Sequence, residues 1–310
     1  MKKLAILNVG GALSCFGEIN GSSFVVDLGK SCDFSPVDDF LLPLAKERCF
    51  HRDPNEGNKY KIDQLFLSHL DNDHTADYSA FDENFTVRYM TCPSDNAKMD
   101  SKFRINRDKI GELTDNKKAI LAEMNRRTPS NPLPLKSIIP NTDLRFINPE
   151  NVEGDSDLDS GYANNISLAL FLESGEKTIL LPGDLLKDGT KYLINNISDF
   201  RNLLSSKGVD YLVAPHHGLQ SSFSSKLFET IKDGKTRLNI ISEKTRESDS
   251  DENRTDVDGR YYSSDFSTGD NALDQYGVKT SQGHIVVDLE SGEEDIKQYT
   301  DIDDVLAEFP

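Results

Sequence analysis

The apolar residues of this chain fall in short runs of strand length, separated by polar and glycine-containing segments. Residues 3–9 (KLAILNV) and 22–28 (SSFVVDL) alternate or run apolar with β-branched content, and residues 63–68 form a third such run. Runs of this kind predict β-strands. The glycine-rich residues 10–21 predict a hairpin or an irregular loop, and residues 38–49 predict a partly helical segment.

Strand-like and helix-like patterns alternate through the rest of the chain. Helices are predicted at 78–85, 198–206 and 222–232. The further predicted strands are residues 86–92, 141–149, 166–172, 177–183, 209–215, 237–242 and 282–289. Mixed strands and helices predict an α/β fold, and the two strand-rich halves indicate two layers of sheet.

Two polar segments interrupt this pattern within one expected domain of residues 1–310. Residues 95–140 are highly charged and have helical periodicity, so they predict a charged helical insertion on the main body. Between Lys98 and Lys136 lie ten basic and five acidic residues, which favour either a solvated helical surface or a wall that faces phosphates. Residues 243–277 are rich in Ser and Asp, and they predict a long polar loop.

The net charge limits the classes of partner. The 310 residues include 53 acidic and 35 basic side chains, for a formal charge of −18. Such a surface repels polyanions at long range, which argues against non-specific DNA binding as the main purpose. A local basic patch can still override the total.

The cysteines and the hydrophobic runs indicate a cytoplasmic protein. No hydrophobic stretch approaches the roughly 20 residues that span a bilayer, so no membrane association is expected. The amino-terminal LAILNV suits a first strand better than a signal peptide, because no small-residue cleavage site follows it. The four cysteines form no C-x-x-C pair, and free thiols are expected.

Side chains that bind metals follow three of the predicted strands directly. They are His69, Asp71, Asp73 and His74 after QLFLS, Asp184 after KTILLPG, and His216 and His217 after VDYLVAP. Four of the six histidines lie in these clusters. Buried charge is costly unless it is paired or binds a metal. The three strand ends therefore predict one shared divalent-metal site at an edge of the sheet.

Simpler interpretations exist for each element of this pattern. The first cluster could be an acidic surface loop, and Asp184 could belong to a turn, but three coincident strand ends favour a metal. His216 and His217 diverge if the backbone is extended, so one is expected to bind metal and the other to support the site or contact substrate. The sequence does not say which. His284 is expected to be structural or exposed, and Asp27 to support the site.

The motifs S-H-L-D-N-D-H, L-L-P-G-D and A-P-H-H-G, in this order, resemble those of the metallo-β-lactamase family. The usual first motif of that family is H-x-H-x-D-H, and Asp71 stands here in place of the second His. With N-N-I-S-L-A-L before the Gly-Asp pair, the set most resembles the hydrolase domain of ComEC-type DNA-uptake proteins and its free-standing relatives. The resemblance covers residues 3–90, 160–242 and 278–292. It implies an αββα sandwich, with two mixed β-sheets flanked by helices.

The resemblance also implies roles for the motif residues. The implied metal ligands are His69, Asp71, Asp73, His74, Asp184 and one of His216 and His217. Asp184 would bridge two ions, and Asp73 would hold or orient the attacking water, so Asp73 and His217 are the candidate catalytic residues. The usual third-motif His is absent, and Asn164 or Asn165 stands in that region as a candidate substrate contact.

The implied activity is metal-dependent hydrolysis. Because oxygen donors replace two histidines, Mn²⁺ and Mg²⁺ join Zn²⁺ as candidates for the two ions. Two ions about 3.5–4 Å apart would orient water and a phosphate oxygen for displacement. The leading hypothesis is a nuclease or nucleotide phosphodiesterase, with nucleic acid or a nucleotide as partner and Arg104 and Arg107 as phosphate contacts. Alternatives are hydrolysis of a non-phosphate ester, lactam or thioester, and a degenerate fold that serves as a binding or regulatory subunit with a protein partner.

Overall fold

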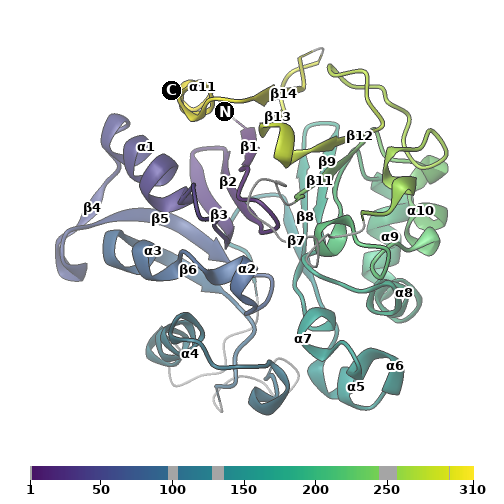
Figure 1. Cartoon of the computed structure of the whole chain (residues 1–310), viewed down its shortest axis with the longest axis horizontal. Coiled ribbons are helices and arrows are strands. Elements are labelled where there is room, and N and C mark those ends of the chain that lie inside the picture. Colours follow the sequence, from purple (N-terminus) through teal and green to yellow (C-terminus); the bar gives the residue numbers. More distant parts are fainter. Residues whose placement is uncertain (1, 97–103, 128–135, 244–256, 293) are drawn as a thin grey trace.

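Two β-sheets lie face to face in the computed structural model, and helices cover their outer sides (Figure 1). The structure describes residues 2–96, 104–127, 136–243, 257–292 and 294–310. Each sheet combines parallel and antiparallel pairs of strands. The predicted α/β sandwich with two mixed sheets flanked by helices is therefore confirmed.

The first sheet has eight strands and is built from the two ends of the chain. Its strands are β1 (Lys2–Ile6), β2 (Ser14–Ile19), β3 (Ser22–Leu28), β4 (Arg52–Asp53), β5 (Lys59–Phe66), β6 (Phe85–Thr91), β13 (His284–Asp288) and β14 (Ile296–Tyr299). The order is β14-β13-β1-β2-β3-β5-β4, and β6 pairs with β5. β5 runs parallel to β3 and to β6, so these strands direct their carboxyl ends to the same edge.

The second sheet has six strands and comes from the middle of the chain. Its strands are β7 (Thr142–Arg145), β8 (Ala169–Ser174), β9 (Lys177–Leu181), β10 (Tyr211–Val213), β11 (Leu238–Ile241) and β12 (Gly277–Lys279), and their order in the sheet is the reverse of this. β8 and β9 pair antiparallel as a hairpin. β9, β10, β11 and β12 run parallel to one another, and helices lie between β9 and β10 and between β10 and β11 along the chain.

The alternation of side chains along the strands builds two hydrophobic clusters. In β1, Leu4 and Ile6 belong to a cluster made almost entirely of strand residues from both sheets, which fills the space between them. Ala5, between them in sequence, belongs to the cluster that includes the helices. Successive side chains of a strand point to opposite faces, so each strand contributes to both layers of core.

Helices cover the outer faces of both sheets (Figure 1). The α-helices of the described residues are α1 (Leu42–Glu47), α2 (Asn72–Thr75), α3 (Tyr78–Asn84), α4 (Asp115–Arg127), α5 (Pro149–Glu153), α6 (Ser156–Asp159), α7 (Tyr162–Asn165), α8 (Lys187–Asn196), α9 (Ser198–Lys207), α10 (Ser225–Thr230) and α11 (Ile302–Ala307). α8, α9 and α10 pack beside the second sheet and bury Leu193, Leu204 and Leu227. A buried Leu contributes about 1.5–3 kcal/mol relative to an exposed one.

Residues 10–21 turn back on themselves as predicted, but they also contain the central strand β2, which the sequence analysis did not assign. Gly17 of β2 pairs directly with Phe24 of β3, and the Phe24 ring lies over the glycine. A Cβ atom at Gly17 would stand 2.2 Å from Cζ of Phe24, so a larger residue has no room. The glycine that weakens the strand pattern is thus required by the packing of the pair.

Two further elements had no clear pattern in the sequence. α8 contains Gly189 and Thr190, both weak helix formers. A Cβ at Gly189 would lie 2.3 Å from Oδ1 of Asn165, so close packing again accounts for the glycine. β14 has one buried apolar residue, Ile296, and depends on its pairing with β13 at the edge of the first sheet.

The described part of the charged insertion is helical and packs onto the main body. α4 buries Ile120, Leu121 and Met124, in agreement with the predicted periodicity. A 3-10 turn covers Arg107–Lys109. Residues 97–103 and 128–135 of the insertion, and 244–256 of the polar loop, lie outside the described residues, so the boundaries 95–140 and 243–277 stay predictions.

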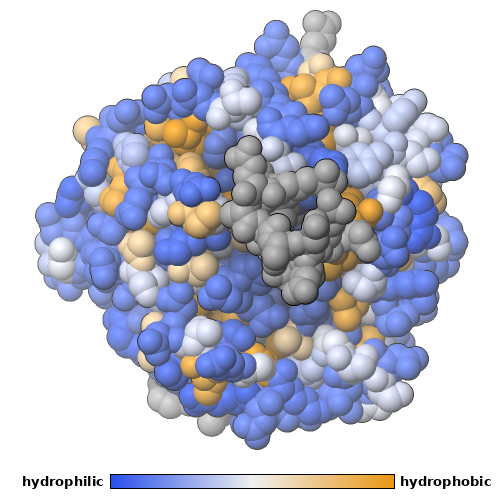
Figure 2. Space-filling view, viewed as in Figure 1, coloured by the Kyte–Doolittle hydropathy of each residue, from blue (hydrophilic) through white to orange (hydrophobic). Residues whose placement is uncertain are grey.

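Hydrophilic side chains cover most of the face seen in Figure 2, in line with the charge of −18. Within the described ranges, no helix has the length and apolar character needed to cross a membrane. All four cysteines are free thiols, as expected, with Cys15 and Cys92 buried and Cys32 and Cys49 exposed.

Candidate metal centre

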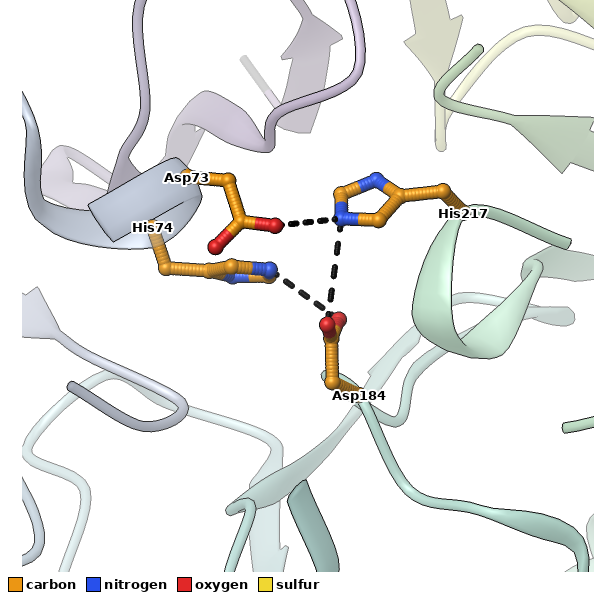
Figure 3. Close-up of side chains that lie close together, drawn as sticks. All are labelled: Asp73, His74, Asp184 and His217. Carbon is orange, nitrogen blue, oxygen red and sulfur yellow. Dashed lines mark hydrogen bonds and ion pairs between the residues drawn. The ribbon is translucent and has the colours of Figure 1, made fainter. Parts of the chain in front are cut away.

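The three predicted strand-end clusters meet at one edge of the sandwich. The first motif follows β5, Asp184 follows β9, and His216 and His217 follow β10. Because β9 and β10 are parallel neighbours, their carboxyl ends lie together, and the segment that follows β5 in the first sheet brings Asp73 and His74 to them. Figure 3 shows side chains from all three segments pointing towards one another.

Four donor atoms, one each from Asp73, His74, Asp184 and His217, lie within 4.8 Å of one another. His217 Nε2 is 3.2 Å from Asp73 Oδ2 and 3.8 Å from Asp184 Oδ2 (Figure 3). His74 Nε2 is 3.0 Å from Asp184 Oδ1. The Asp73 side chain is 39% exposed, whereas that of Asp184 is only 4% exposed. The group therefore opens to solvent beside Asp73.

Two other predicted ligands, His69 and His216, approach the same Asp184 carboxylate without joining this group, and Asp71 lies beside His69. His69 Nε2 lies 3.8 Å from Asp184 Oδ2 and 3.8 Å from Asp71 Oδ2. His216 Nε2 lies 3.7 Å from Asp184 Oδ2. Asp184 is thus the common neighbour of all four histidines of the motifs, as expected for the residue placed at the centre of the site.

The two adjacent histidines do not diverge, because their backbone is not extended as the sequence analysis assumed. His216 (φ 49°, ψ 52°) and His217 (φ 56°, ψ 22°) are both left-handed, and Gly218 follows with φ 77°. A left-handed non-glycine residue costs about 1–2 kcal/mol. Strain of this kind is typical of functional sites that the surrounding fold holds in place. The turn brings both imidazoles towards Asp184.

The loop of Asp184 is held closely against its neighbours. Gly183 has φ 60°, and a Cβ atom there would lie 2.8 Å from Cβ of Ser68. The Asp184 amide donates to Ser167 Oγ at 3.1 Å, and the His216 amide donates to Gly183 O at 3.1 Å. The glycine of the Gly-Asp pair is therefore required both by its conformation and by the close approach of the first motif.

Three buried imidazole nitrogens lack hydrogen-bond partners in the described structure: His69 Nε2, His74 Nε2 and His216 Nδ1. His74 Nε2 approaches Asp184 Oδ1 closely, but without the geometry of a hydrogen bond. An unsatisfied buried polar atom costs about 1–3 kcal/mol. A divalent ion would satisfy such nitrogens, and two carboxylates with two imidazoles form a donor set that suits first-row divalent metals. The residues fit a metal site.

Asp27 orients the ligands from behind, as the sequence analysis expected. It is fully buried, and its Oδ2 lies 2.8 Å from His74 Nδ1 and accepts from Ser68 Oγ at 2.8 Å. Its Oδ1 accepts from the Ser68 amide at 2.7 Å. An ionised carboxylate only accepts, so Asp27 holds a proton on His74 Nδ1 and leaves Nε2 as the nitrogen that would bind an ion, once the ion has displaced any proton there. Ser68 Oγ also lies 3.1 Å from His69 Nδ1.

The charges of the site keep its carboxylates ionised. Burial alone would raise the pKa of Asp184, but His74 and His217 outweigh it and hold this pKa well below its usual range. Burial alone would also raise the pKa of Asp73. The hydrogen bond with His217 outweighs burial, and the pKa of Asp73 falls to about 2. Burial would lower the pKa of His74, but Asp184 and Asp27 raise it well above the usual value. The negative charge of the site is therefore available to a cation.

The predicted substrate contacts lie outside the four-donor group. Asn165 is fully buried, where its side chain donates to Leu158 O at 2.8 Å and accepts from the Leu186 amide at 3.3 Å. Its amide is thus used inside the fold. Asn164 is half-buried, and Arg104 is exposed. Arg107 is also exposed and lies 3.4 Å from Asp95.

Two residues of the insertion reach the first motif, and the sequence analysis did not single them out. Asn116 Nδ2 donates to Thr75 O at 2.9 Å and to Ala76 O at 3.0 Å. Lys117 Nζ lies 3.1 Å from Asp71 Oδ1. The only signal in the sequence was the position of Lys117 among apolar helix positions, where a lysine must pair if it is buried.

A cavity of about 490 Å³ lies elsewhere, beside the amino-terminal half of β5 and the β2–β3 turn. None of its lining residues belongs to the metal motifs. Among its charged lining residues, Arg48 pairs with Glu18 and Lys61 with Asp53. The donor geometry, rather than this cavity, therefore marks the candidate site.

No family model matches this sequence, and no curated protein matches it. Among solved structures, the chain is similar to the metallo-β-lactamase fold protein YhfI from Bacillus subtilis (12% identity, 78% of this chain and 86% of that chain, TM-score 0.38). It is similar to Igni18, a metallo hydrolase from Ignicoccus hospitalis (8% identity, 78% of this chain and 83% of that chain, TM-score 0.35). It is also similar to CmlA, a diiron β-hydroxylase from Streptomyces venezuelae (11% identity, 77% of this chain and 44% of that chain, TM-score 0.39). Such identities transfer no function, so function is argued from this chain's own residues.

Proposed function

We propose that this protein is a metal-dependent hydrolase whose ion is held by Asp73, His74, Asp184 and His217. The observation that carries the proposal is the convergence of these four donors within 4.8 Å, with buried imidazole nitrogens left unsatisfied. When bound, a divalent ion supplies a Lewis acid that makes water a nucleophile near neutral pH.

The side chains of the site divide the work of binding and orienting. Asp184, central and buried, provides the charge that draws the cation. Asp73 is the exposed member of the group and accepts a contact from His217 Nε2 at 3.2 Å, so it is placed to orient the attacking water. Asp27 contacts Nδ1 of His74 and Ser68 contacts Nδ1 of His69, and these contacts fix the orientation of the two imidazoles.

The proposed substrate is a phosphodiester, in nucleic acid or in a nucleotide. The support is the likeness of the H-x-D-x-D-H, Gly-Asp and H-H-G motifs to the ComEC-type hydrolase domain. Most described basic residues of the insertion are paired: Lys109 with Asp159, Lys118 with Asp115, and Arg126 with Glu123. A small or locally held phosphodiester therefore suits the acidic surface better than a long duplex.

The candidate ions are Zn²⁺, Mn²⁺ and Mg²⁺. The second ion that the motifs imply would need ligands outside the four-donor group, and His69, Asp71 and His216 are the motif residues that remain. We also propose a cytoplasmic location, which the four free cysteines support.

The test combines metal content with a panel of substrates. We expect purified protein to hydrolyse bis-(p-nitrophenyl) phosphate, and single-stranded DNA, with added Mn²⁺. Asp184→Asn keeps the volume but removes the charge, and should lower metal content and turnover more than the about 10–100-fold typical of residues that only support a ligand. The matched control is Asp188→Asn, an exposed carboxylate at the start of α8 that pairs with Lys191 and should change neither quantity.

Each outcome decides between hypotheses. Turnover of nitrocefin, p-nitrophenyl acetate or a thioester without phosphodiester turnover would replace the substrate but keep the hydrolase. Bound metal with no turnover on any substrate would favour a binding or regulatory subunit. A protein that binds no divalent ion would overturn the proposal.

A further inference from the structure

Lys117 is a buried lysine that reaches the metal motif from the charged insertion. Its side chain is 6% exposed, although it belongs to α4, the helix of a highly charged segment. Its ammonium lies 3.1 Å from Asp71 Oδ1 and donates to Ile110 O at 2.7 Å. A buried ammonium is costly unless it is paired, so this contact defines a specific position for the charge.

The backbone around Lys117 is anchored to the same motif. The preceding residue, Asn116, donates to the carbonyls of Thr75 and Ala76, and it accepts from Ser79 Oγ. The start of α4 is thus fastened to both α2 and α3. The next residue, Lys118, is 56% exposed and, among the described residues, pairs with exposed Asp115, so it offers a matched lysine on the same helix.

Asp71 occupies the place where a second ion would need a ligand. It stands where the family motif has its second histidine, and its Oδ2 lies 3.8 Å from His69 Nε2. However, the described metal-type residues form one group with all donor atoms within 4.8 Å, and neither Asp71 nor His69 belongs to it. An ion at Asp71 would also lie within a few ångströms of the Lys117 ammonium, where like charges repel.

We propose that Lys117 takes the place of a second cation, so that the centre binds one divalent ion and Lys117 holds Asp71 as a positioning residue. The ammonium neutralises Asp71 and fixes it beside His69, while the four-donor group holds the single ion. This inference rests on the proposed metal centre but not on the proposed substrate. The charged insertion would then complete the metal centre from the side of α2.

The experiment measures Mn²⁺ and Zn²⁺ binding to metal-stripped full-length protein by titration calorimetry and native mass spectrometry. We expect wild type to bind about one ion per chain tightly, and Lys117→Met to gain a second ion whose Kd is at least tenfold lower than any second Kd of wild type. Methionine keeps an unbranched apolar stem of similar length. Lys118→Met, on the same helix, should behave as wild type.

Asp71→Asn keeps the inference testable if Lys117→Met does not fold. If Lys117 replaces the second ion, Asp71→Asn should leave the stoichiometry and the Kd of the first ion unchanged within about threefold. Two tightly bound ions in wild type, reduced to one by Asp71→Asn, would overturn the inference while the proposed hydrolase stands. A Lys117→Met variant that folds and still binds one ion would overturn it as well. Absence of any binding would overturn both proposals.

Discussion

Replacing Asp27 by Asn should weaken metal binding although Asp27 is not in the four-donor group. The carboxylate accepts from His74 Nδ1, from Ser68 Oγ and from the Ser68 amide, all within 2.8 Å. An amide of the same shape can accept at Oδ1 from Ser68, but its Nδ2 would then face His74 Nδ1 with hydrogens. His74 would shift its proton to Nε2, and the lone pair directed into the site would be lost.

The size of the effect follows from the role of Asp27 as an outer support of a ligand. Removing such a partner typically lowers metal affinity about 10–100-fold, which corresponds to about 1.4–2.7 kcal/mol of binding free energy. The expected Kd of Asp27→Asn is therefore one to two decades above that of wild type. The first-ion stoichiometry should stay the same, because the four donors themselves are unchanged.

Titration calorimetry of Mn²⁺ into metal-stripped protein measures this Kd directly, with circular dichroism as the check on folding. Asp63→Asn is the matched control, because Asp63 also accepts from a backbone amide, that of Ser23 at 2.9 Å, but lies away from the motifs. A folded Asp27→Asn protein with the Kd of wild type would show that Asp27 does not set the tautomer of His74.

Two further predictions concern stability. Burial lowers the pKa of His284 to about 4, weakly opposed by Asp301, and neutral His284 Nδ1 accepts from the Asn8 amide at 3.1 Å. Because the folded pKa lies below the unfolded value of about 6.5, the unfolded state binds more protons, and stability falls by up to about 3 kcal/mol as the pH drops from 6.5 towards 4. Urea unfolding at pH 7.5 and 4.5 should show this loss, and a smaller one in His284→Gln. Gly17→Ala should cost about 1–3 kcal/mol by overpacking Phe24, whereas Gly259→Ala, with nothing within 4 Å of its Cβ, should unfold close to wild type.

The sequence was most informative where local periodicity and burial coincide. The strands β3, β8 and β9 match the predicted runs, because their apolar residues face core on both sides of a sheet. It was least informative at β2 and α8, where Gly17 and Gly189 serve close contacts with Phe24 and Asn165. A local pattern records the glycine but not the distant residue that requires it.

For the candidate site too, some features were visible in the sequence and others only in the structure. The residue types that bind metal, and their position after strands, are visible in the sequence because ligand chemistry needs particular side chains at strand ends. The sequence could not show which way the candidate substrate contacts point. The side-chain amide of Asn165 points into the fold and donates to Leu158 O. The sequence analysis stated that His216 and His217 diverge if their backbone is extended, and this condition is not met, because the left-handed turn depends on the surrounding fold.

The sequence alone determined that this is an α/β protein with residues of metal-binding type after three strands, because hydrophobic periodicity and donor chemistry are local properties of the chain. The tertiary structure decided which donors meet. His217 and Asp73 are 144 positions apart, and Lys117 and Asp71 are 46 apart. Such pairs form only when the two sheets close and the insertion folds back, because contacts between distant residues follow from strand order and helix packing rather than from any local pattern.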